Sequence, residues 1–278
     1  MGLHYGCFPQ ERVGNQWRRF ETLTSADGQK PTSDQSLPPK PKDTGLLSVL
    51  PPPPPKIDTM KKKLPVFNEV IDTTTFAEGE LALMLEEAGL VDIQTLDSSI
   101  QVSLVYATDN NFLGRNVYGD LTQCYLQKEV AAMLVKAQGI LKESHPNLSL
   151  LIYDGVRPQS VQKKMWNIVK GTPMQNYVAP PWPGSMHNHG AAVDLSLVNA
   201  LGQPLDMGTP FDHLGPLAQP RYEDKYMREG KLTKEQVENR RLLRKVMKQA
   251  GFRIILSEWW HFNAFSKAKV RAMYPLVK

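Results

Sequence analysis

The sequence predicts an α+β fold, with a central, mainly antiparallel sheet flanked by helices and a proline-rich extension before it. Helical and strand-like segments alternate irregularly and are separated by long loops, unlike the regular alternation of a doubly wound sheet. Ten of the 22 prolines fall within the first 55 residues, and apolar periodic segments begin only after about residue 64. We therefore expect residues 1–63 to be a disordered, proline-rich extension and residues 64–278 to form one domain.

The first half of this domain is predicted to contain two helices and two strands. Helical periodicity over 80–88 ends at Gly89, and a second amphipathic helix is expected over 128–143. Residues 101–106 alternate as a strand should. Residues 148–153 form a short, mostly apolar run, which is typical of a central strand.

An Asp-Gly turn signal at 154–155 ends that strand, and the next helix is expected over 158–169. The following stretch, 174–184, is rich in Pro and Gly and predicts a loop. This loop leads into another alternating strand over 192–197.

Near the C-terminus, Thr233 and Gln236 form a capping-box pattern that opens a helix. The helix should run to about residue 250 and stop at Gly251. Residues 252–256 then predict a strand, and Glu258 and His261 lie at or just beyond its end.

The positive charge of the chain is concentrated in the extension. The formal net charge is +5, but residues 1–63 carry ten Lys/Arg and six Asp/Glu, a net of +4, which leaves +1 for the rest. The basic composition therefore does not indicate a nucleic-acid-binding face, and we expect no nucleic-acid partner.

Cysteine use and hydropathy narrow the class further. The two cysteines, Cys7 and Cys124, suggest no disulfide framework; we expect one free thiol in the extension and one buried thiol. No segment reaches the roughly 18 apolar residues of a membrane span. The expected location is the cytoplasm, with an unrecognised route to the periplasm as the alternative, and the oligomeric state stays open.

The prolines at 51–55 allow two interpretations of the extension. They could present a polyproline helix to a partner. The alternative, which we favour, is an idle extension or a true start at Met60.

Two separated pairs of residues together provide the side chains that a catalytic zinc site requires. His187 precedes Asp194 by seven residues, and Glu258 precedes His261 by three, directly behind an apolar segment. A catalytic zinc ion keeps three protein ligands and an open position for water, with a further carboxylate acting as base. We expect His187, Asp194 and His261 to hold one Zn²⁺ and Glu258 to be the base, because no carboxylate would remain for that role if Glu258 were a ligand. Trp259 and Trp260 would supply a water-excluding wall.

Two further residues, His189 and Arg157, have competing interpretations. His189 could replace a ligand, but an exposed loop imidazole is the favoured interpretation. Arg157 could stabilise the negative oxygen of a hydrolytic transition state, or it could form only a salt bridge to Asp154.

Several blocks together closely resemble the D-alanyl-D-alanine dipeptidases, zinc enzymes known from vancomycin resistance. The similarity covers about residues 66–265 and leaves the extension outside. The blocks that carry it are Tyr153-Asp154-Gly155-Val156-Arg157-Pro158, Ser185-x-His187-x-x-Gly190-x-Ala192-x-Asp194 and Glu258-Trp259-Trp260-His261, supported by 106–112, 206–208 with 211–212, and 239–244.

The resemblance implies roles for individual residues. His187, Asp194 and His261 match the family's zinc ligands, Glu258 its base and Arg157 its transition-state stabiliser. It further implies that Tyr106 and Asp212 lie around the amino end of the substrate and that Ser185 lies near its carboxylate. Each residue also has an interpretation without a role in substrate binding: Tyr106 could pack within a strand, Asp212 could be a turn residue, and Ser185 could be a loop hydroxyl.

The function implied is zinc-dependent hydrolysis of D-alanyl-D-alanine to two D-alanines, a reaction of peptidoglycan precursors. One alternative is a D,D-carboxypeptidase, or another peptidoglycan stem peptidase of the same superfamily. A less favoured alternative is a non-catalytic zinc module, which would normally fill all four coordination positions.

Overall fold

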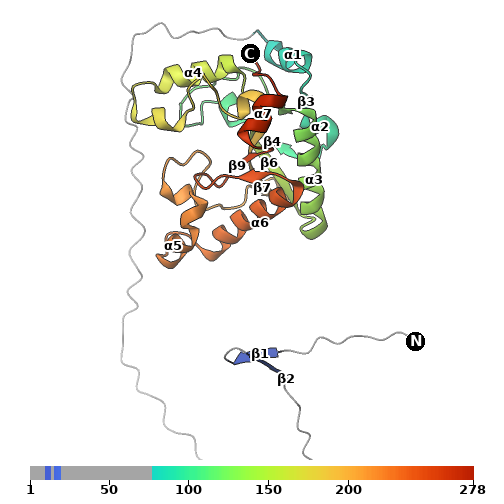
Figure 1. Cartoon of the computed structure of the whole chain (residues 1–278), viewed down its shortest axis with the longest axis vertical. Coiled ribbons are helices and arrows are strands. Elements are labelled where there is room, and N and C mark those ends of the chain that lie inside the picture. Colours follow the sequence, from blue (N-terminus) through green and yellow to red (C-terminus); the bar gives the residue numbers. More distant parts are fainter. Residues whose placement is uncertain (1–9, 14–15, 20–76) are drawn as a thin grey trace, which may run out of the picture. The chain divides into compact units, whose positions relative to one another are not determined.

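The computed structural model describes residues 10–13, 16–19 and 77–278. Within the extension, strands β1 (Gln10–Val13) and β2 (Gln16–Arg19) form an antiparallel pair (Figure 1). The remainder of 1–63, including Cys7 and the prolines at 51–55, lies outside the described residues, so the disordered extension and the boundary at residue 64 stay predictions.

A five-stranded sheet lies at the centre of residues 77–278, with the strand order β4-β6-β7-β9-β8. The strands are β4 (Gln101–Val102), β6 (Leu148–Asp154), β7 (Ala192–Asn199), β9 (His261–Asn263) and β8 (Arg253–Ile254). β4 runs parallel to β6, and every other pairing is antiparallel. The prediction of an α+β fold with a mainly antiparallel sheet is confirmed.

Helices surround this sheet (Figure 1). They are α1 (Glu80–Glu87), α2 (Ile93–Leu96), α3 (Lys128–Ser144), α4 (Gln159–Val169), α5 (Glu223–Arg228), α6 (Lys234–Ala250) and α7 (Lys267–Met273). α3 and α6 pack against each other; α3 also contacts β6, and α6 contacts β7 and β8. A separate two-stranded pair joins β3 (Val91–Asp92) to β5 (Tyr125–Leu126). The interior includes the thiol of Cys124, which is free and buried as expected.

Local signals placed α6 correctly. The Thr233 hydroxyl accepts a hydrogen bond from the Gln236 amide, and the Gln236 side chain accepts one from the Thr233 amide. This reciprocal cap satisfies two amide groups that the first helical turn leaves unpaired. At the other end Gly251 adopts φ 108°, a left-handed conformation that favours glycine and ends the helix.

Two predicted strands were too long. Pairing in the first stops after β4, because Val105–Ala107 tightens into a 3₁₀ turn, η1, closed by a bond from the Ala107 amide to the Leu104 carbonyl. The second predicted strand, 252–256, is reduced to β8. His261 does not extend that strand, because the chain turns between the two segments and His261 begins β9, antiparallel to β8.

The loop predicted over 174–184 contains a 3₁₀ turn, η2 (Pro173–Tyr177), whose N-terminus is capped by the Thr172 hydroxyl. Among the helices that the structure describes, none is long and apolar enough to cross a membrane.

Candidate metal centre and its cleft

Three neighbouring strands place acidic and imidazole side chains in one row. Asp154 on β6 pairs with Asp194 on β7, and Asp194 pairs with His261 on β9. Directly opposite residues on antiparallel strands project to the same face of a sheet. The register therefore brings Asp194 and His261 together although 67 positions separate them.

His187 reaches this row from the turn before β7, the 3₁₀ turn η3 (His187–His189). Gly190 closes the turn with φ 64° and donates its amide to the His187 carbonyl at 3.0 Å. A Cβ on Gly190 would lie 2.8 Å from the Leu90 side chain and 3.3 Å from the Gln127 amide. Only glycine fits both the conformation and the space, so Gly190 allows His187 to sit directly before the strand that carries Asp194.

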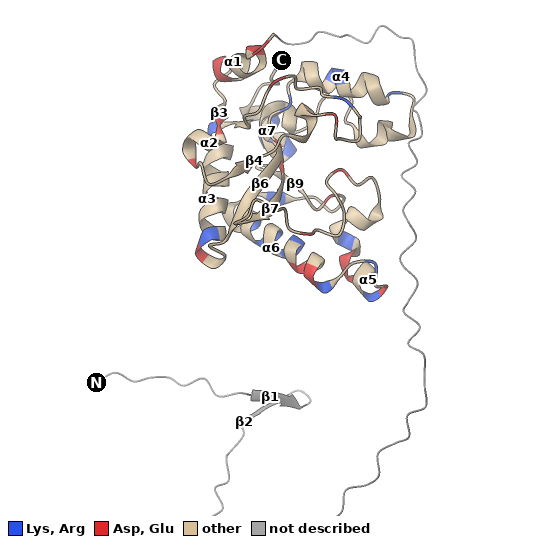
Figure 2. Cartoon of the chain, turned by 180° about the vertical axis from the view of Figure 1, so that it is seen from behind, with Lys and Arg blue, Asp and Glu red and all other residues tan. Residues whose placement is uncertain are grey.

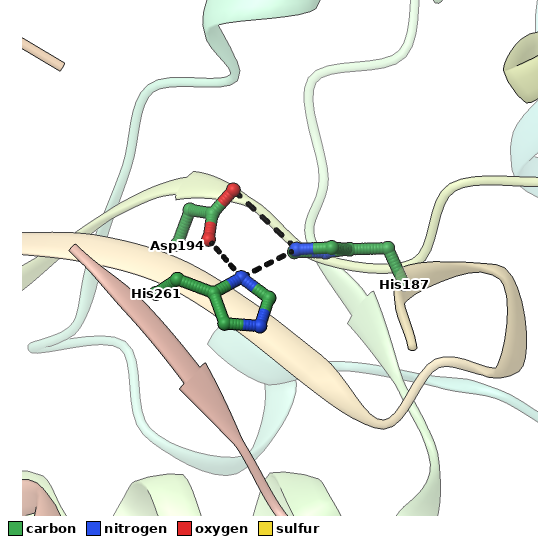
Figure 3. A group of neighbouring side chains, drawn as sticks. All are labelled: His187, Asp194 and His261. Carbon is green, nitrogen blue, oxygen red and sulfur yellow. Dashed lines mark hydrogen bonds and ion pairs between the residues drawn. The ribbon is translucent and has the colours of Figure 1, made fainter. Parts of the chain in front are cut away.

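The three side chains converge on one point, as Figure 3 shows. Asp194 Oδ1 lies 2.9 Å from His261 Nδ1, and Asp194 Oδ2 lies 3.4 Å from His187 Nε2. The two ring nitrogens are 3.2 Å apart. Bonds of about 2.0–2.1 Å to a tetrahedral zinc ion would separate ligand atoms by about 3.3 Å, so the donor set has the spacing of such a site.

The outer ring nitrogens fix which atoms face the centre. His187 Nδ1 lies 2.7 Å from the Gly155 carbonyl, which can only accept, so Nδ1 carries the proton and Nε2 presents a lone pair. His261 Nε2 lies 3.1 Å from Asn263 Oδ1, which leaves the lone pair of Nδ1 facing inward. With neutral imidazoles, two lone pairs and the Asp194 carboxylate face one another, an arrangement that a cation stabilises.

The ionisation of these three side chains reflects the same convergence. Burial favours the neutral form of His261, but the hydrogen bond and charge of Asp194 raise the pKa of His261 to about 8. Burial alone would raise the pKa of Asp194, yet the nearby charge of His187 and the hydrogen bonds lower it below its ordinary range. Both shifts show that this point attracts positive charge.

Glu258 lies in the turn between β8 and β9 and lines the same cavity. Burial raises its pKa above the ordinary value of 4.5, while the nearby His261 lowers it. A carboxylate with a raised pKa beside a metal-binding group is suited to accept and return a proton.

Arg157 is both ion-paired and exposed to the cavity. Its Nη2 donates to the buried carboxylate of Asp154, which also accepts a 2.6 Å hydrogen bond from the Tyr118 hydroxyl. Its Nη1 donates to Gln162 Oε1 at 3.3 Å, and its Nε has no hydrogen-bond partner among the described residues. The guanidinium lies 5.1 Å from the centre of the Tyr106 ring. The salt bridge to Asp154, which the sequence offered as the alternative role of Arg157, is therefore present, and it fixes the guanidinium at the cleft wall.

The cleft is a cavity of about 540 Å³. Every residue predicted for the site lines it: Tyr106, Arg157, Ser185, His187, Asp194, Asp212, Glu258 and His261. Of the predicted tryptophan wall, Trp260 lines the cavity, and Trp259 is buried and packs against it with ring centroids 5.3 Å apart.

The three predicted substrate contacts all line the cleft, and two of them are hydrogen-bonded to each other. The Tyr106 hydroxyl, on η1, donates to Asp212 Oδ2 at 2.7 Å. The backbone of Asp212 has φ 59°, a left-handed conformation that residues other than glycine rarely adopt. Burial raises the pKa of the Asp212 carboxyl group. The Ser185 hydroxyl is buried and has no partner among the described residues.

His189 corrects one expectation, because it is buried rather than an exposed loop imidazole. Its Nδ1 lies 2.8 Å from the Tyr274 carbonyl. In the same region the Val277 amide donates to the Asn188 carbonyl at 2.8 Å. His189 therefore attaches the turn η3 to the C-terminal segment and lies outside the group of converging ligand atoms.

Sequence reasoning missed the residues that support the site. Asn263 lies two positions after His261, and that spacing on a strand was a usable signal. No local signal indicated Gln162 or the carbonyl of Gly155, since their contacts depend on how the loops fold.

Comparison with known proteins gives a consistent result. The family model described as D-ala-D-ala dipeptidase, Peptidase M15, matches residues 86–277. The D-alanyl-D-alanine dipeptidase of Escherichia coli K12 is 33% identical over 194 residues, which cover 70% of this chain and 92% of that protein. The protein of the same name from Synechocystis is 30% identical over 183 residues, 55% of this chain and 72% of the relative. The one from Enterococcus faecalis is 28% identical, covering 64% and 92%.

Proposed function

The chain belongs to the D-alanyl-D-alanine dipeptidase family, and we propose that its cleft hydrolyses D-alanyl-D-alanine to two D-alanines with one Zn²⁺ held by His187, Asp194 and His261. The observation that carries this proposal is the convergence of three lone-pair donors 2.9–3.4 Å apart beside a half-buried carboxylate and a fixed guanidinium.

The residues present fit zinc. Two imidazoles and one carboxylate are a donor set that zinc accepts in catalytic sites, and each imidazole is oriented from behind by the Gly155 carbonyl or Asn263. When bound, zinc supplies Lewis acidity toward water and the carbonyl oxygen of the substrate.

Glu258 moves the proton in this proposal. Its carboxylate takes a proton from the attacking water and then delivers it to the amine that leaves. The raised pKa of Glu258 supports both steps, because the carboxylic acid form is then accessible after the first transfer.

Arg157 meets the negative charge that develops on the carbonyl oxygen. The ion pair with Asp154 and the bond to Gln162 hold its guanidinium in place before substrate arrives. Such preorganised donors stabilise a transition state more than a mobile side chain would.

Recognition of a dipeptide requires partners for both charged ends. We assign the ammonium group to Asp212 and Tyr106, and the carboxylate to Ser185, whose buried hydroxyl has no partner among the described residues. A longer peptide would bury uncharged amide groups against these partners, which costs free energy.

The direct experiment is an assay of purified protein with D-alanyl-D-alanine. We expect release of D-alanine, loss of release with chelator and recovery when zinc is added. Absence of chelator-sensitive release would overturn the proposal. A parallel assay with a pentapeptide stem tests the D,D-carboxypeptidase alternative, which predicts faster cleavage of the stem.

The non-catalytic zinc module is the weaker candidate. Among the described residues the group of possible ligands has three members, not four, which supports an open coordination position. Location in the cytoplasm remains a prediction that only fractionation of cells can test.

A further inference from the structure

The loop from Met207 to Leu217 brings Asp212 and His213 to the cleft. Asp212 holds a left-handed conformation there, with φ 59°. Such a conformation costs free energy for a residue other than glycine and persists when the surroundings enforce it. The contacts that hold this loop therefore decide where the Asp212 carboxylate lies.

Arg240 on α6 forms hydrogen bonds to both ends of the loop. Its Nε donates to the Met207 carbonyl at 2.6 Å, and its Nη1 donates to the Leu217 carbonyl at 3.0 Å. Its Nη2 makes a longer contact of 3.5 Å to the Thr209 hydroxyl. The side chain is completely buried, so solvent does not compete for these donors.

The same residue reaches the segment beside the proposed base. The Thr209 hydroxyl accepts a 2.8 Å hydrogen bond from Trp259 Nε1, and the Arg240 guanidinium lies 5.8 Å from the centre of the Trp259 ring. Trp259 directly follows Glu258 in the chain. The buried guanidinium of Arg240 thus contacts both the loop 207–217 and Trp259, the residue next to Glu258.

The charge of Arg240 is only partly compensated. Glu223 Oε1 lies 3.6 Å from Arg240 Nη1, but the same carboxylate forms a two-point ion pair with Arg244, at 2.8 and 2.5 Å. Burial lowers the pKa of Arg240 to about 10. Burying a cation is costly, and an apolar residue would fill the space at less cost if only packing were needed. The two carbonyl contacts are what the guanidinium adds.

We propose that Arg240 is a positioning residue that fixes the loop 207–217, and through it Asp212, for recognition of the substrate's amino end. The proposal rests on the function proposed above. A lysine keeps the charge but cannot donate to two separate carbonyls from a rigid planar fork, so Arg240→Lys isolates the geometric contribution.

The test compares zinc-loaded wild type, Arg240→Lys and the matched control Arg241→Lys. Arg241 is the next residue on α6 and pairs with exposed Asp224 at 2.5 Å, away from the cleft. For Arg240→Lys we expect KM for D-alanyl-D-alanine to rise about tenfold, with kcat within about threefold and unchanged zinc content. The control should match wild type.

A double mutant tests whether the effect passes through Asp212. In an Asp212→Asn background, Arg240→Lys should raise KM by less than about twofold further, because the positioned carboxylate is already gone. Independent, multiplying effects on KM would overturn the proposal. So would a loss of kcat and zinc content with KM unchanged.

Amide hydrogen exchange keeps the proposal testable without activity. We expect faster exchange over 207–217 in Arg240→Lys, and unchanged exchange there would overturn the proposal even if the wild type failed to cleave the dipeptide. If Arg240→Lys does not fold, Arg240→Gln takes its place in the exchange measurement, because a glutamine cannot donate to both the Met207 and the Leu217 carbonyl as the guanidinium does. Faster exchange of the loop in that variant supports the inference, and an unchanged loop contradicts it.

Discussion

The Tyr106 hydroxyl donates a 2.7 Å hydrogen bond to the Asp212 carboxylate, although 106 positions separate the two residues. The bond joins the turn η1 to the loop 207–217, and both residues line the cleft. Burial raises the pKa of both groups. The rings of Phe112 and Phe211 pack edge-on against the Tyr106 ring, so this polar contact lies beside aromatic side chains.

Tyr106→Phe should weaken substrate binding more than catalysis. Removing the hydroxyl leaves a buried carboxylate without this donor, a loss of about 1–3 kcal/mol. We expect KM to rise about tenfold or more with a smaller change in kcat. Steady-state kinetics with Tyr222→Phe, on the exposed surface, as control would check this. A fall in kcat at constant KM would mean that Tyr106 does not act in binding.

Glu258→Ala should bind zinc normally and lose turnover. The carboxylate is the proposed proton carrier and not a ligand, so zinc content should stay at one ion per chain while kcat falls by about 10²- to 10⁴-fold. Metal analysis and kinetics on the same preparation decide the matter. Near-normal turnover would exclude Glu258 as the base.

Replacing a proposed ligand should remove metal and stability together. For His261→Ala we expect zinc content well below one ion per chain, and a melting temperature that no longer responds to chelator. Wild type should lose stability on chelation, because a ligand present at 1,000 times its Kd stabilises the folded state by about 4 kcal/mol. His145→Ala, at an exposed position, should retain both properties.

The pH dependence should show the environment of Glu258. Burial raises its pKa above 4.5, and only the ionised carboxylate can accept a proton, so kcat/KM should fall as pH drops through a value higher than 4.5. The profile is measured with zinc content checked at every pH. A profile without any acid limb while zinc is retained would contradict the assignment of Glu258 as the base.

Asp154→Asn should harm both stability and turnover. Asp154 is fully buried and pairs with Arg157, so the substitution leaves a buried cation without its counter-charge, at a cost of about 3–5 kcal/mol. We expect a lower melting temperature and a lower kcat, since Arg157 loses its anchor. Denaturation and kinetics measured side by side test this, and a variant with unchanged kcat would show that Asp154 does not position Arg157.

Local signals predicted a large part of this structure. The cap at Thr233 and the stop at Gly251 act within a few residues, so they set α6 correctly from sequence. The convergence of His187, Asp194 and His261 was predicted from two pairs taken together, His187 with Asp194 and Glu258 with His261, and from the resemblance to a family of zinc peptidases.

Contacts between distant segments could not be predicted in the same way. His189 is buried because the Tyr274 carbonyl, 85 positions away, meets its ring. The segment around Tyr106 alternates as a strand does, but its pairing ends after Val102 and the chain turns to face Asp212. Arg240 is one of several charged residues along α6 (Figure 2), and only the folded loop brings two carbonyls to its donors.

Asp194 on β7 lies opposite His261 on β9, so uptake of the proposed zinc ion would report the alignment of these two strands. A slip of β7 by one residue would turn Asp194 to the opposite face of the sheet and separate it from His261. On the proposed ligand set, refolded protein that takes up one zinc ion per chain has β7 and β9 correctly aligned, and protein in which these two strands are misaligned would remain metal-free even if its secondary structure content were native.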